Sequence, residues 1–517
     1  MSTSDATPTT ESTLQGTWVL AATILASSMA FIDSTALNVT LPAIQSDLQA
    51  SGVQLLWVVN GYLLMLAALI LIGGSLGDRL GRKRVFMSGI TIFMLGSLAC
   101  GLSPTIGWLI GFRFVQGVGG ALMIPGSLAI ITAYFPIDRR GAAIGTWAAV
   151  TTLVTIAGPL LGGVLADAGL WRWVFLINLP LGIIALVILF ARVPESRDET
   201  LGGGIDIPGA VLAALGLAGL TYGLLTAPAH GFSDPRVYIP LIGGALALVL
   251  FVALEAHSSH PMLPLTLFRS PTFSGANLLT FFLYGALNVV SLFLSLNMVQ
   301  AQGYSQTQAG LAVLPFSILL ALLSRWAGRL VDRIGSRRPL VIGPFVTGLG
   351  FLLLGLVGET SGPTSYWTTF FPGVCLFGLG MSITVAPLTT TVMSAVANHY
   401  SGTASGVNNA VARTGSVLAI AILGALALLA FRANLDNLSN GIDLAPGQRQ
   451  ALLAQASQLG DAVVPADIQG QAAQAAGQAI QTAFIDTYQL VLWICAGLAG
   501  LSALMALWLI DGRLADT

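Results

Sequence analysis

The sequence contains very little charge. Asp, Glu, Lys and Arg make up only 8% of its 517 residues, whereas roughly 25% is typical of a soluble protein. So few charges cannot cover a surface that faces water on all sides, which excludes a soluble enzyme. The 21 basic and 22 acidic residues nearly balance, so no basic surface indicates a nucleic-acid partner.

Cysteine and histidine are also scarce. The three cysteines, Cys100, Cys375 and Cys495, lie in apolar segments and form no CxxC pair, which argues against disulfides and metal ligation. None of the four histidines lies in the middle of an apolar segment, so haem ligation is not expected. The sequence also lacks a phosphate-binding loop of the GxxxxGK[ST] type. We therefore expect no metal, no cofactor and no direct use of ATP.

Apolar residues, in contrast, are abundant. They make up 55% of the chain and form long blocks, and about 20 such residues are enough to cross a hydrocarbon core of ~30 Å. The 60 glycines suit closely packed membrane helices rather than a β-barrel. We therefore predict an all-α polytopic membrane protein with fourteen spanning helices at 17–41, 54–76, 84–103, 106–135, 141–166, 172–192, 206–227, 237–255, 272–300, 308–330, 339–358, 367–396, 405–431 and 484–510.

The basic residues predict the orientation of these helices. Residues 1–16 are polar and contain no Lys or Arg, unlike the start of a signal peptide, so the first apolar block is expected to remain as a helix. With the N-terminus in the cytoplasm, most Lys and Arg residues fall in cytoplasmic loops, as the positive-inside rule requires. Only Arg113 and Arg413 fall well inside predicted helices. We therefore expect both termini on the cytoplasmic side.

One internal repeat indicates how the chain is divided. Residues 77–84 (GDRLGRKR) reappear in degenerate form at 331–338 (VDRIGSRR), and repeated halves around a central site are typical of secondary transporters. The spacing predicts a polar tail (1–16), a six-helix bundle (17–192), a linker with two additional helices (193–262) and a second six-helix bundle (263–517). The second bundle includes an extracytoplasmic loop, 433–483, whose Gln/Ala-rich stretch 469–483 is either an external helix or a mobile loop.

Asp33 is the sharpest candidate for a functional residue. It lies about 15 residues into the first apolar block, or ~22 Å from the inner surface. A carboxylate at that depth costs roughly 2.5–3.5 kcal/mol on insertion scales, so it should face a partner or a water-filled cavity. We interpret Asp33 as a reversible proton carrier. The alternative is a neutral Asp that is hydrogen-bonded between helices.

Arg113, in the fourth block, is predicted at a similar depth. A buried guanidinium stays charged, and it would favour the ionised form of a neighbouring carboxyl group. Our hypothesis is that access of water or substrate alters the coupling between Arg113 and Asp33, and thereby loads and unloads a proton. The alternative is a static ion pair.

Two glycine-containing segments are candidates for moving parts. Between the second and third helices, glycines would allow close backbone approach and a tight turn. Asp78 would pair with an arginine or with a helix N-terminus, as a contact that can break and re-form. The alternative for the basic residues is that they only anchor the loop on the cytoplasmic side. These residues are Gly74, Gly77, Asp78, Arg79, Gly81, Arg82 and Lys83, with Asp332, Arg333 and Gly335 in the second copy. In the fifth helix, a kink combined with a small-residue face is expected from Gly158, Pro159, Gly162 and Gly163.

Aromatic and amide side chains within the blocks are candidates for a substrate pocket. Aromatic faces accept both cations and apolar rings, so such residues would form an adaptable pocket. Helix packing is the alternative for each of them, and hydrogen bonding between helices is the alternative for Arg413. The candidates are Phe31, Trp57, Tyr62, Asn277, Phe281, Tyr284, Asn288 and Arg413.

Taken together, these segments resemble the fourteen-helix drug:proton antiporter branch of the major facilitator superfamily. The similarity covers nearly the whole membrane region. Residues 74–84 resemble the cytoplasmic loop motif of the superfamily, and 331–338 its second copy. Arg113 with Gln116 and Gly117 resembles the arginine motif of the fourth helix, and 158–163 the antiporter motif of the fifth. The segments 33–42 and 171–182 are specific to the branch.

The resemblance implies alternating access, export from the cytoplasm or inner leaflet, and coupling to inward proton flow. It implies a proton or cation site at Asp33, a position near the coupling pathway for Arg113, and a cytoplasmic gate at Asp78. Two features depart from the family pattern. Val154 stands where a glycine is expected, which leaves the fifth helix less pliable. The ninth to thirteenth helices carry no acid away from their ends, so dicationic substrates are not expected.

We therefore expect proton-coupled efflux of lipophilic, neutral or monocationic small molecules across the cytoplasmic membrane of a bacterium. The expected partners are protons, the substrate and membrane lipid, and the protein is expected to be a monomer. The sequence leaves three alternatives open. These are a dedicated exporter of an endogenous metabolite, lipid or siderophore, a nutrient importer, and a non-transporting membrane sensor or scaffold.

Overall fold

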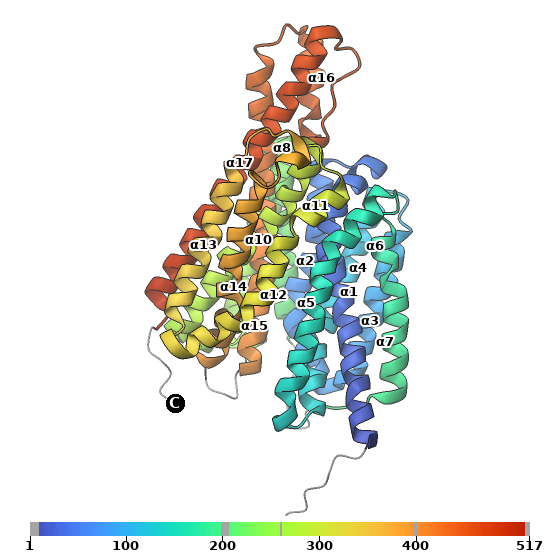
Figure 1. Ribbon diagram of the computed structural model, residues 1–517, viewed down its shortest axis with the longest axis vertical. Coiled ribbons are helices and arrows are strands. Elements are labelled where there is room, and N and C mark those ends of the chain that lie inside the picture. Colours follow the sequence, from blue (N-terminus) through green and yellow to red (C-terminus); the bar gives the residue numbers. More distant parts are fainter. Residues whose placement is uncertain (1–9, 198–205, 259–260, 397–400, 512–517) are drawn as a thin grey trace, which may run out of the picture.

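The computed structural model describes residues 10–197, 206–258, 261–396 and 401–511. Within these ranges every regular element is a helix, and 14 helical segments are long and apolar enough to cross a membrane. Most of them run along the long axis of the molecule (Figure 1). The predicted all-α fold with fourteen spans is therefore confirmed.

The first six spans occupy the N-terminal part of the chain. They are α1 (Thr10–Leu48), α2 (Gly52–Leu80), α3 (Arg82–Gly101), α4 (Ile106–Tyr134), α5 (Ile137–Asp167) and the pair α6 (Trp173–Leu176) and α7 (Asn178–Arg192), which share one span. Residues 1–9 of the predicted polar tail lie outside the described residues, and 10–16 already belong to α1. Two additional spans follow, α8 (Ile207–His230) and α9 (Pro235–His257).

The last six spans begin after a short 3₁₀ helix, η1 (Leu265–Arg269). They are α10 (Pro271–Leu296), which continues as the π-helix η2 (Asn297–Ala301), the pair α11 (Gln306–Ala312) and α12 (Leu314–Ile334), α13 (Arg337–Gly355), α14 (Phe370–Ser394), α15 (Ser401–Ser439) and α17 (Gly470–Leu509). The remaining short helices are η3 (Gly362–Ser365), α16 (Pro446–Ala454) and η5 (Gln455–Asp461).

The molecule has two distinct ends. Helix α1 begins and α17 ends at the same end, which we call the terminal end (bottom of Figure 1). Residues 433–483 project from the opposite end, which we call the hairpin end. An even number of spans requires both termini on one side. That this side is the cytoplasm stays a prediction.

The predicted extracytoplasmic loop is largely helical. Helix α15 continues to Ser439, and α17 begins at Gly470, so the Gln/Ala-rich stretch forms a helix. These two helices have 39 and 40 residues, and at ~1.5 Å per residue each is about 60 Å long, twice the thickness of the hydrocarbon core. They therefore extend well beyond the membrane and carry α16 at the tip (Figure 1).

Local sequence signals account for several helix boundaries. Ser51 and Gln54 form a capping box at the start of α2, in which Ser51 N donates to Gln54 Oε1 at 2.9 Å. Asp206 and Asp234 cap α8 and α9, and each is followed by a proline in the first turn. The turn before α3 contains Gly81 with φ +111°, in the left-handed region where glycine is preferred.

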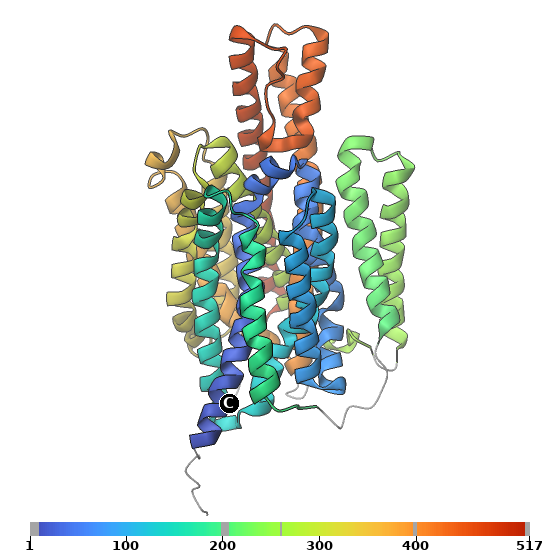
Figure 2. The ribbon, with the colours of Figure 1, turned by 90° about the vertical axis from the view of Figure 1, so that its right-hand side faces the viewer.

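Helices α8 and α9 form a pair at the side of the bundle. They approach each other closely, because a Cβ added at Gly244 would lie 2.7 Å from the Leu220 nitrogen. Helix α8 also contacts α2 and α15, and the pair stands beside the other spans in Figure 2. The two additional helices therefore flank the seam between α2 and α15 and do not separate the two six-helix groups.

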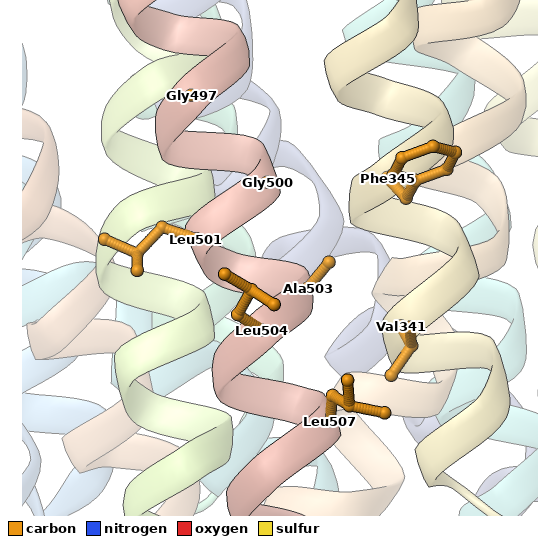
Figure 3. A pocket seen from close by; sticks show the side chains of 8 residues that line it. All are labelled: Val341, Phe345, Gly497, Gly500, Leu501, Ala503, Leu504 and Leu507. Atoms are coloured by element: carbon orange, nitrogen blue, oxygen red, sulfur yellow. The ribbon is translucent and has the colours of Figure 1, made fainter.

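A groove of about 670 Å³ lies between α13 and α17 on the outer surface of the bundle (Figure 3). Its lining consists of apolar or small residues, namely Val341, Phe345, Gly497, Gly500, Leu501, Ala503, Leu504 and Leu507. Because no polar or charged side chain lines it, this groove is not a candidate for the coupling or substrate site.

Candidate functional site

Asp33 and Arg113 form a buried ion pair between α1 and α4. Arg113 Nη1 donates to Asp33 Oδ2 at 2.7 Å, and the exposed fractions of the two side chains are 0% for Asp33 and 1% for Arg113. Both residues are predicted at similar depth from the sequence, and the structure brings them into contact. Their role in proton coupling stays a prediction.

Gln116, one turn further along α4, forms hydrogen bonds to both members of the ion pair. Its Nε2 donates to Asp33 Oδ1 at 2.9 Å, and its Oε1 accepts from Arg113 Nη1 at 2.7 Å. Arg113 Nε also donates to the Val58 carbonyl of α2 at 3.0 Å. Both carboxylate oxygens of Asp33 therefore have a hydrogen-bond donor in this conformation.

Ser97 extends the network to the sixth span. Its hydroxyl accepts from Gln116 Nε2 at 3.3 Å and from Asn178 Nδ2 at 2.9 Å, and it donates to the Phe175 carbonyl at 2.8 Å. The network thus joins α1, α2, α3, α4, α6 and α7. Gln116 and Asn178 belong to segments that the resemblance singled out, but Ser97 is an ordinary helix residue, and nothing in the sequence marks it.

Two aromatic rings cover the Arg113 guanidinium. Its central carbon lies 4.6 Å from the ring centroid of Tyr62 and 5.9 Å from that of Phe175, distances at which cation–π attraction operates. Breaking a buried pair by removing one partner typically costs about 3–5 kcal/mol. The ion pair and the two rings therefore keep Asp33 out of contact with water in this conformation.

The turn between α2 and α3 contains the predicted gate residues. Asp78 Oδ1 pairs with Arg82 Nη2 at 2.8 Å, one turn away along the chain. Gly81 makes the tight turn, as expected. Gly74 and Gly77 are not close contacts in this structure, because an added Cβ would lie 3.8 and 3.9 Å from its nearest neighbours. The role of these two glycines in a moving gate stays a prediction.

The close approach in this region occurs at Gly73 instead. A Cβ there would overlap the Ala121 carbonyl of α4. The spacing of glycines along one helix does not show which of its faces meets α4, so the sequence could not distinguish Gly73 from its neighbours.

Glu195 caps the N-terminus of α3, a role that the sequence analysis did not assign. Its carboxylate accepts from the backbone nitrogens of Lys83 and Arg84 at 2.9 and 3.2 Å, and Lys83 Nζ donates to the Val193 carbonyl at 2.7 Å. The segment after α7 therefore holds the α2–α3 turn. An acidic residue is favoured at a helix N-terminus by the partial positive charge of the unpaired N–H groups.

The second copy of this motif ends in the same kind of turn. Gly335 has φ +76°, as Gly81 has φ +111°. The side chains of Asp332 and Arg333 lie outside the described residues.

The glycines of α5 pack directly against α1, next to Asp33. A Cβ at Gly158 would overlap the Thr35 hydroxyl, and a Cβ at Gly162 would lie 2.5 Å from the Ala36 carbonyl oxygen. Thr35 is only two residues from Asp33. The small-residue face predicted for α5 is therefore confirmed as a helix contact, and its partner is the segment that carries the buried carboxylate.

The adjacent face of α5 packs against α11, in the other six-helix group. A Cβ at Gly163 would overlap the Gln306 carbonyl oxygen, and a Cβ at Gly310 would overlap the Pro159 carbonyl oxygen. Helix α5 thus contacts both the Asp33 segment of α1 and the opposite half of the protein over one turn.

Asp167, the last residue of α5, caps α11 across this seam. Its carboxylate accepts from Ser305 Oγ at 2.9 Å and from the backbone nitrogens of Gln306 and Thr307, both at 2.8 Å. The sequence offered one signal for this contact. A carboxylate at the C-terminus of its own helix is electrostatically unfavourable, so it is expected to bind elsewhere.

A second set of contacts closes the hairpin end. Gln300 of η2 donates to Gln45 Oε1 at 2.8 Å, and Gln45 Nε2 donates to the Gln458 carbonyl of η5 at 2.9 Å. A Cβ at Gly52 would lie 2.7 Å from the Leu459 side chain. Helix η5 therefore rests on the α1–α2 turn, and the two halves are joined at this end.

A polar pocket lies in the second half of the protein, between α10, α14 and α15. Its lining residues are Tyr284, Thr389, Val392, Ser405, Asn408, Asn409 and Ala412. Asn409 and Thr389 are exposed although both belong to membrane-spanning helices. Because amide groups are costly in contact with lipid, this face is expected to meet water.

The structure distributes the predicted pocket residues over several places. Asn277 accepts from Asn408 Nδ2 at 3.2 Å, and Asn288 donates to Ser416 Oγ at 2.9 Å, so both amides join α10 to α15. Tyr284 lines the polar pocket. Arg413 lies one residue beyond Ala412 on α15.

The aromatic candidates pack mainly on other rings. Trp57 lies 6.0 Å from Phe114, and Phe281 lies 5.3 Å from Phe282, between ring centroids. Tyr62 covers Arg113, and Phe31 is half-buried on α1. The predicted residues therefore do not form one continuous pocket in this structure.

Fourteen spanning helices, in two groups of six with one additional pair, together with a buried ion pair and a joined hairpin end, define a polytopic membrane transporter. Residues 23–420 match the model of the Major Facilitator Superfamily. The chain belongs to this family, as its resemblance implied, and it is a multi-pass transporter of the bacterial cell membrane.

Curated relatives support this assignment over most of the chain. It is 36% identical to the multidrug resistance protein Stp of Mycobacterium tuberculosis over 81% of this chain and 77% of that protein. It is 32% identical to a tetracenomycin C resistance and export protein of Streptomyces glaucescens over 93% of this chain and 89% of that protein. A cephamycin export protein of Amycolatopsis lactamdurans is 35% identical over 80% of this chain and 85% of that protein.

A solved structure shares the fold at low sequence identity. A bacterial homologue of the human lysosomal transporter Spinster, in an inward-facing conformation, is 18% identical and has a TM-score of 0.63, covering 97% of this chain and 99% of that one. With relatives named for drug resistance and export, the chain is assigned to drug efflux.

Proposed function

We propose that this protein exports lipophilic small molecules in exchange for protons, with Asp33 as the proton carrier. One observation carries the proposal: the only ion pair that the described residues bury almost completely contains Asp33, and helix α5 packs on α1 beside it. Relatives named for multidrug resistance and antibiotic export support efflux as the direction.

Helix α5 provides a mechanical path from the seam between the halves to the carboxylate. One face of its glycine turn contacts α11, and the other contacts Thr35 and Ala36. When the halves separate at the hairpin end, there are two possible movements. Either α5 separates from α11, or α5 stays with α11 and is displaced relative to α1. Either movement disturbs the surroundings of Asp33, which is two residues from Thr35, and thereby gives water access to the carboxylate.

Protonation would then change the strength of the ion pair. A neutral carboxyl group loses its attraction to Arg113, so the proton-loaded state releases the contact between α1 and α4. Arg113 remains charged and keeps its bonds to the Val58 carbonyl and Gln116. Loss of the proton on the other side of the membrane restores the pair. This cycle couples proton movement to the rocking of the halves.

The test is substrate-evoked proton flux in proteoliposomes. Compounds to which the wild-type protein confers resistance in cells are added to vesicles that enclose a pH-sensitive dye. We expect Asp33→Asn to bind these compounds but to abolish the proton flux, because an amide fills the same space without a titratable proton. Asp436→Asn is the matched control, because it removes a carboxylate from an ion pair with Arg449 at 2.6 Å that lies outside the membrane. Equal flux in wild type and Asp33→Asn would refute the proposal.

A dedicated exporter of one compound is the second candidate. Relatives named for single antibiotics, tetracenomycin C and cephamycin among them, favour it. The breadth of the resistance panel separates the two: protection against one chemical class indicates a dedicated exporter, and protection against several unrelated classes indicates multidrug efflux.

A further inference from the structure

The groove between α13 and α17 is an open apolar surface on the outside of the bundle. Gly497 and Gly500 of α17 line it, and no atom of the described residues lies within 4 Å of a Cβ built at either glycine. Phe345 on α13 and Leu507 on α17 border it, with 56% and 39% of their surface exposed (Figure 3). In a bilayer, apolar groups of neighbouring molecules fill such a groove of about 670 Å³, because a gap forfeits dispersion contacts.

The groove has the depth of a single lipid leaflet. Toward the hairpin end the two helices come together, because a Cβ at Gly348 would lie 3.2 Å from the Ala496 carbonyl oxygen. From Gly497 to Leu507 the lining extends over ten residues of α17, which is ~15 Å along the helix axis and half of a hydrocarbon core of ~30 Å. The groove therefore begins near the middle of the membrane and runs to the terminal end.

Two arginines lie where the groove reaches the terminal end. Arg337, the first residue of α13, extends across to α17, where its Nη2 donates to the Leu507 carbonyl. Its buried Nε has no hydrogen-bond partner among the described residues, and the adjacent Arg338 is exposed. Trp508, beside Leu507, is 67% exposed. Because exposed tryptophans gather at the membrane–water interface, this end of the groove lies at the level of the lipid headgroups.

The charge at this end is positive. Neither Arg337 nor Arg338 forms an ion pair with a described residue, and Asp511 is the one acid among the described side chains at the terminal ends of α13 and α17. Arginine presents several N–H donors in a planar array that matches phosphate. Basic sites between membrane helices attract the headgroups of anionic lipids. A zwitterionic lipid is less suited, since its own ammonium group cancels the charge of its phosphate.

A second copy of the chain does not match this surface. A two-fold interface joins the same patch of both copies, so the groove would face another groove and leave a gap. The same arrangement would bring Arg337 and Arg338 of both copies together, where like charges repel. A single acyl chain, in contrast, is a narrow apolar rod that enters the groove from the side.

We propose that the groove between α13 and α17 binds one acyl chain of an anionic phospholipid from the leaflet at the terminal end, with the lipid phosphate held by Arg337 and Arg338. Membrane lipid is an expected partner of any spanning protein, and the inference gives it one position and one charge class. The inference does not depend on proton coupling or on the cargo, since no residue of the Asp33 network takes part in it.

The first test is native mass spectrometry of the full-length protein in detergent. The protein is incubated with equal amounts of phosphatidylglycerol and phosphatidylcholine, which carry identical acyl chains and differ in headgroup charge and mass. We expect the first bound lipid to be phosphatidylglycerol with a preference of at least about tenfold, which corresponds to ~1.4 kcal/mol. Arg337→Gln combined with Arg338→Gln should reduce this preference to about twofold or less.

The matched control combines Arg84→Gln with Arg192→Gln. It removes the same charge from two exposed arginines at the terminal end of the first half, away from the groove, and should leave the preference unchanged. Both lipids are measured on the same molecules, so a partial loss of folded protein does not affect their ratio.

The second test blocks the groove and keeps both arginines. Gly500→Phe places a phenyl ring in the groove without a clash, because a Cβ there meets no described atom within 4 Å. We expect it to lower the occupancy of the first phosphatidylglycerol at least about fivefold. Gly243→Phe is the matched control, since Gly243 is an equally open and exposed glycine on α9, and it should leave the occupancy unchanged.

Several results would overturn the inference. These are equal binding of the two lipids by the wild type, an unchanged preference in the double arginine variant, and unchanged lipid occupancy in Gly500→Phe. A lipid-free dimer that Gly500→Phe dissociates would also overturn it, because the groove would then bind a second copy of the chain.

Discussion

Asp167 offers a direct test of how the two halves are held together at the hairpin end. It belongs to the first half, and all three of its hydrogen bonds are donated by residues 305–307 of the second half, at 2.8–2.9 Å. Asp167→Ala removes these bonds without adding bulk. We expect the variant to favour conformations in which α5 and α11 are apart.

The size of the effect follows from the kind of contact. A capping Asp replaced by Ala typically costs about 1 kcal/mol, and bonds to a charged acceptor are stronger than that when shielded. Asp167 is exposed, so we take ~1.4 kcal/mol for the whole set, which is about tenfold in the ratio of open to closed molecules.

Spin labels at the exposed positions Ala168 and Gln308 report this ratio through double electron–electron resonance. The control is Asp47→Ala, which loses bonds to Arg172 at 2.7 Å and Trp171 at 3.0 Å within the first half alone. We expect the long-distance population to rise about tenfold only in Asp167→Ala. The same change in both variants, or none in Asp167→Ala, would refute the reasoning.

Three further predictions concern other contacts. Gly163→Leu should abolish drug resistance in cells, because its side chain collides with the Gln306 carbonyl, whereas Gly145→Leu on the same helix should be tolerated, since no atom lies within 4 Å of a Cβ there; equal resistance would contradict this. Cysteines at Gln45 and Gln300, joined through two disulfides by a short bis-methanethiosulfonate reagent, should stop transport until the link is reduced, and unaffected transport would argue against opening at this end. Glu195→Gln should accelerate hydrogen exchange of residues 82–84 about two- to fivefold, as expected for losing ~0.3–1 kcal/mol at a helix N-terminus, and unchanged exchange would mean that the cap contributes nothing.

Features that depend on one helix at a time could be predicted from the sequence. The count of spans came from apolar block length, and the similar depths of Asp33 and Arg113 came from counting residues along two helices. The small-residue face of α5 could also be predicted, because its glycines are spaced so that they lie on one side of the helix. In each case the relevant information lies within a single segment.

Features that join distant segments could not be predicted in this way. Glu195 and Asp167 each bind the N-terminus of a helix that is remote in sequence, and periodicity along one helix says nothing about which other helix it meets. For the same reason the close contact of Gly73 with Ala121 of α4 could not be predicted from the sequence. The helical course of 469–483 also stayed open, because Gln and Ala suit either an exposed helix or a loop.

The candidate substrate-pocket residues show the same limit of prediction from sequence. Asn277 and Tyr284 lie two turns apart on α10, yet one joins α10 to α15 and the other lines the cavity. Residue type cannot distinguish these roles, since an amide serves equally well in packing and in recognition.

The stalks of the external hairpin are continuous with α15 and α17, while η5 at its base rests on the α1–α2 turn of the opposite half. The hairpin therefore protrudes beyond the bilayer, is part of the second half of the protein, and contacts the first half. If the halves separate at this end as proposed, this contact has to break and re-form in each transport cycle. A binder that holds η5 on the α1–α2 turn is then expected to stop transport without entering the bilayer.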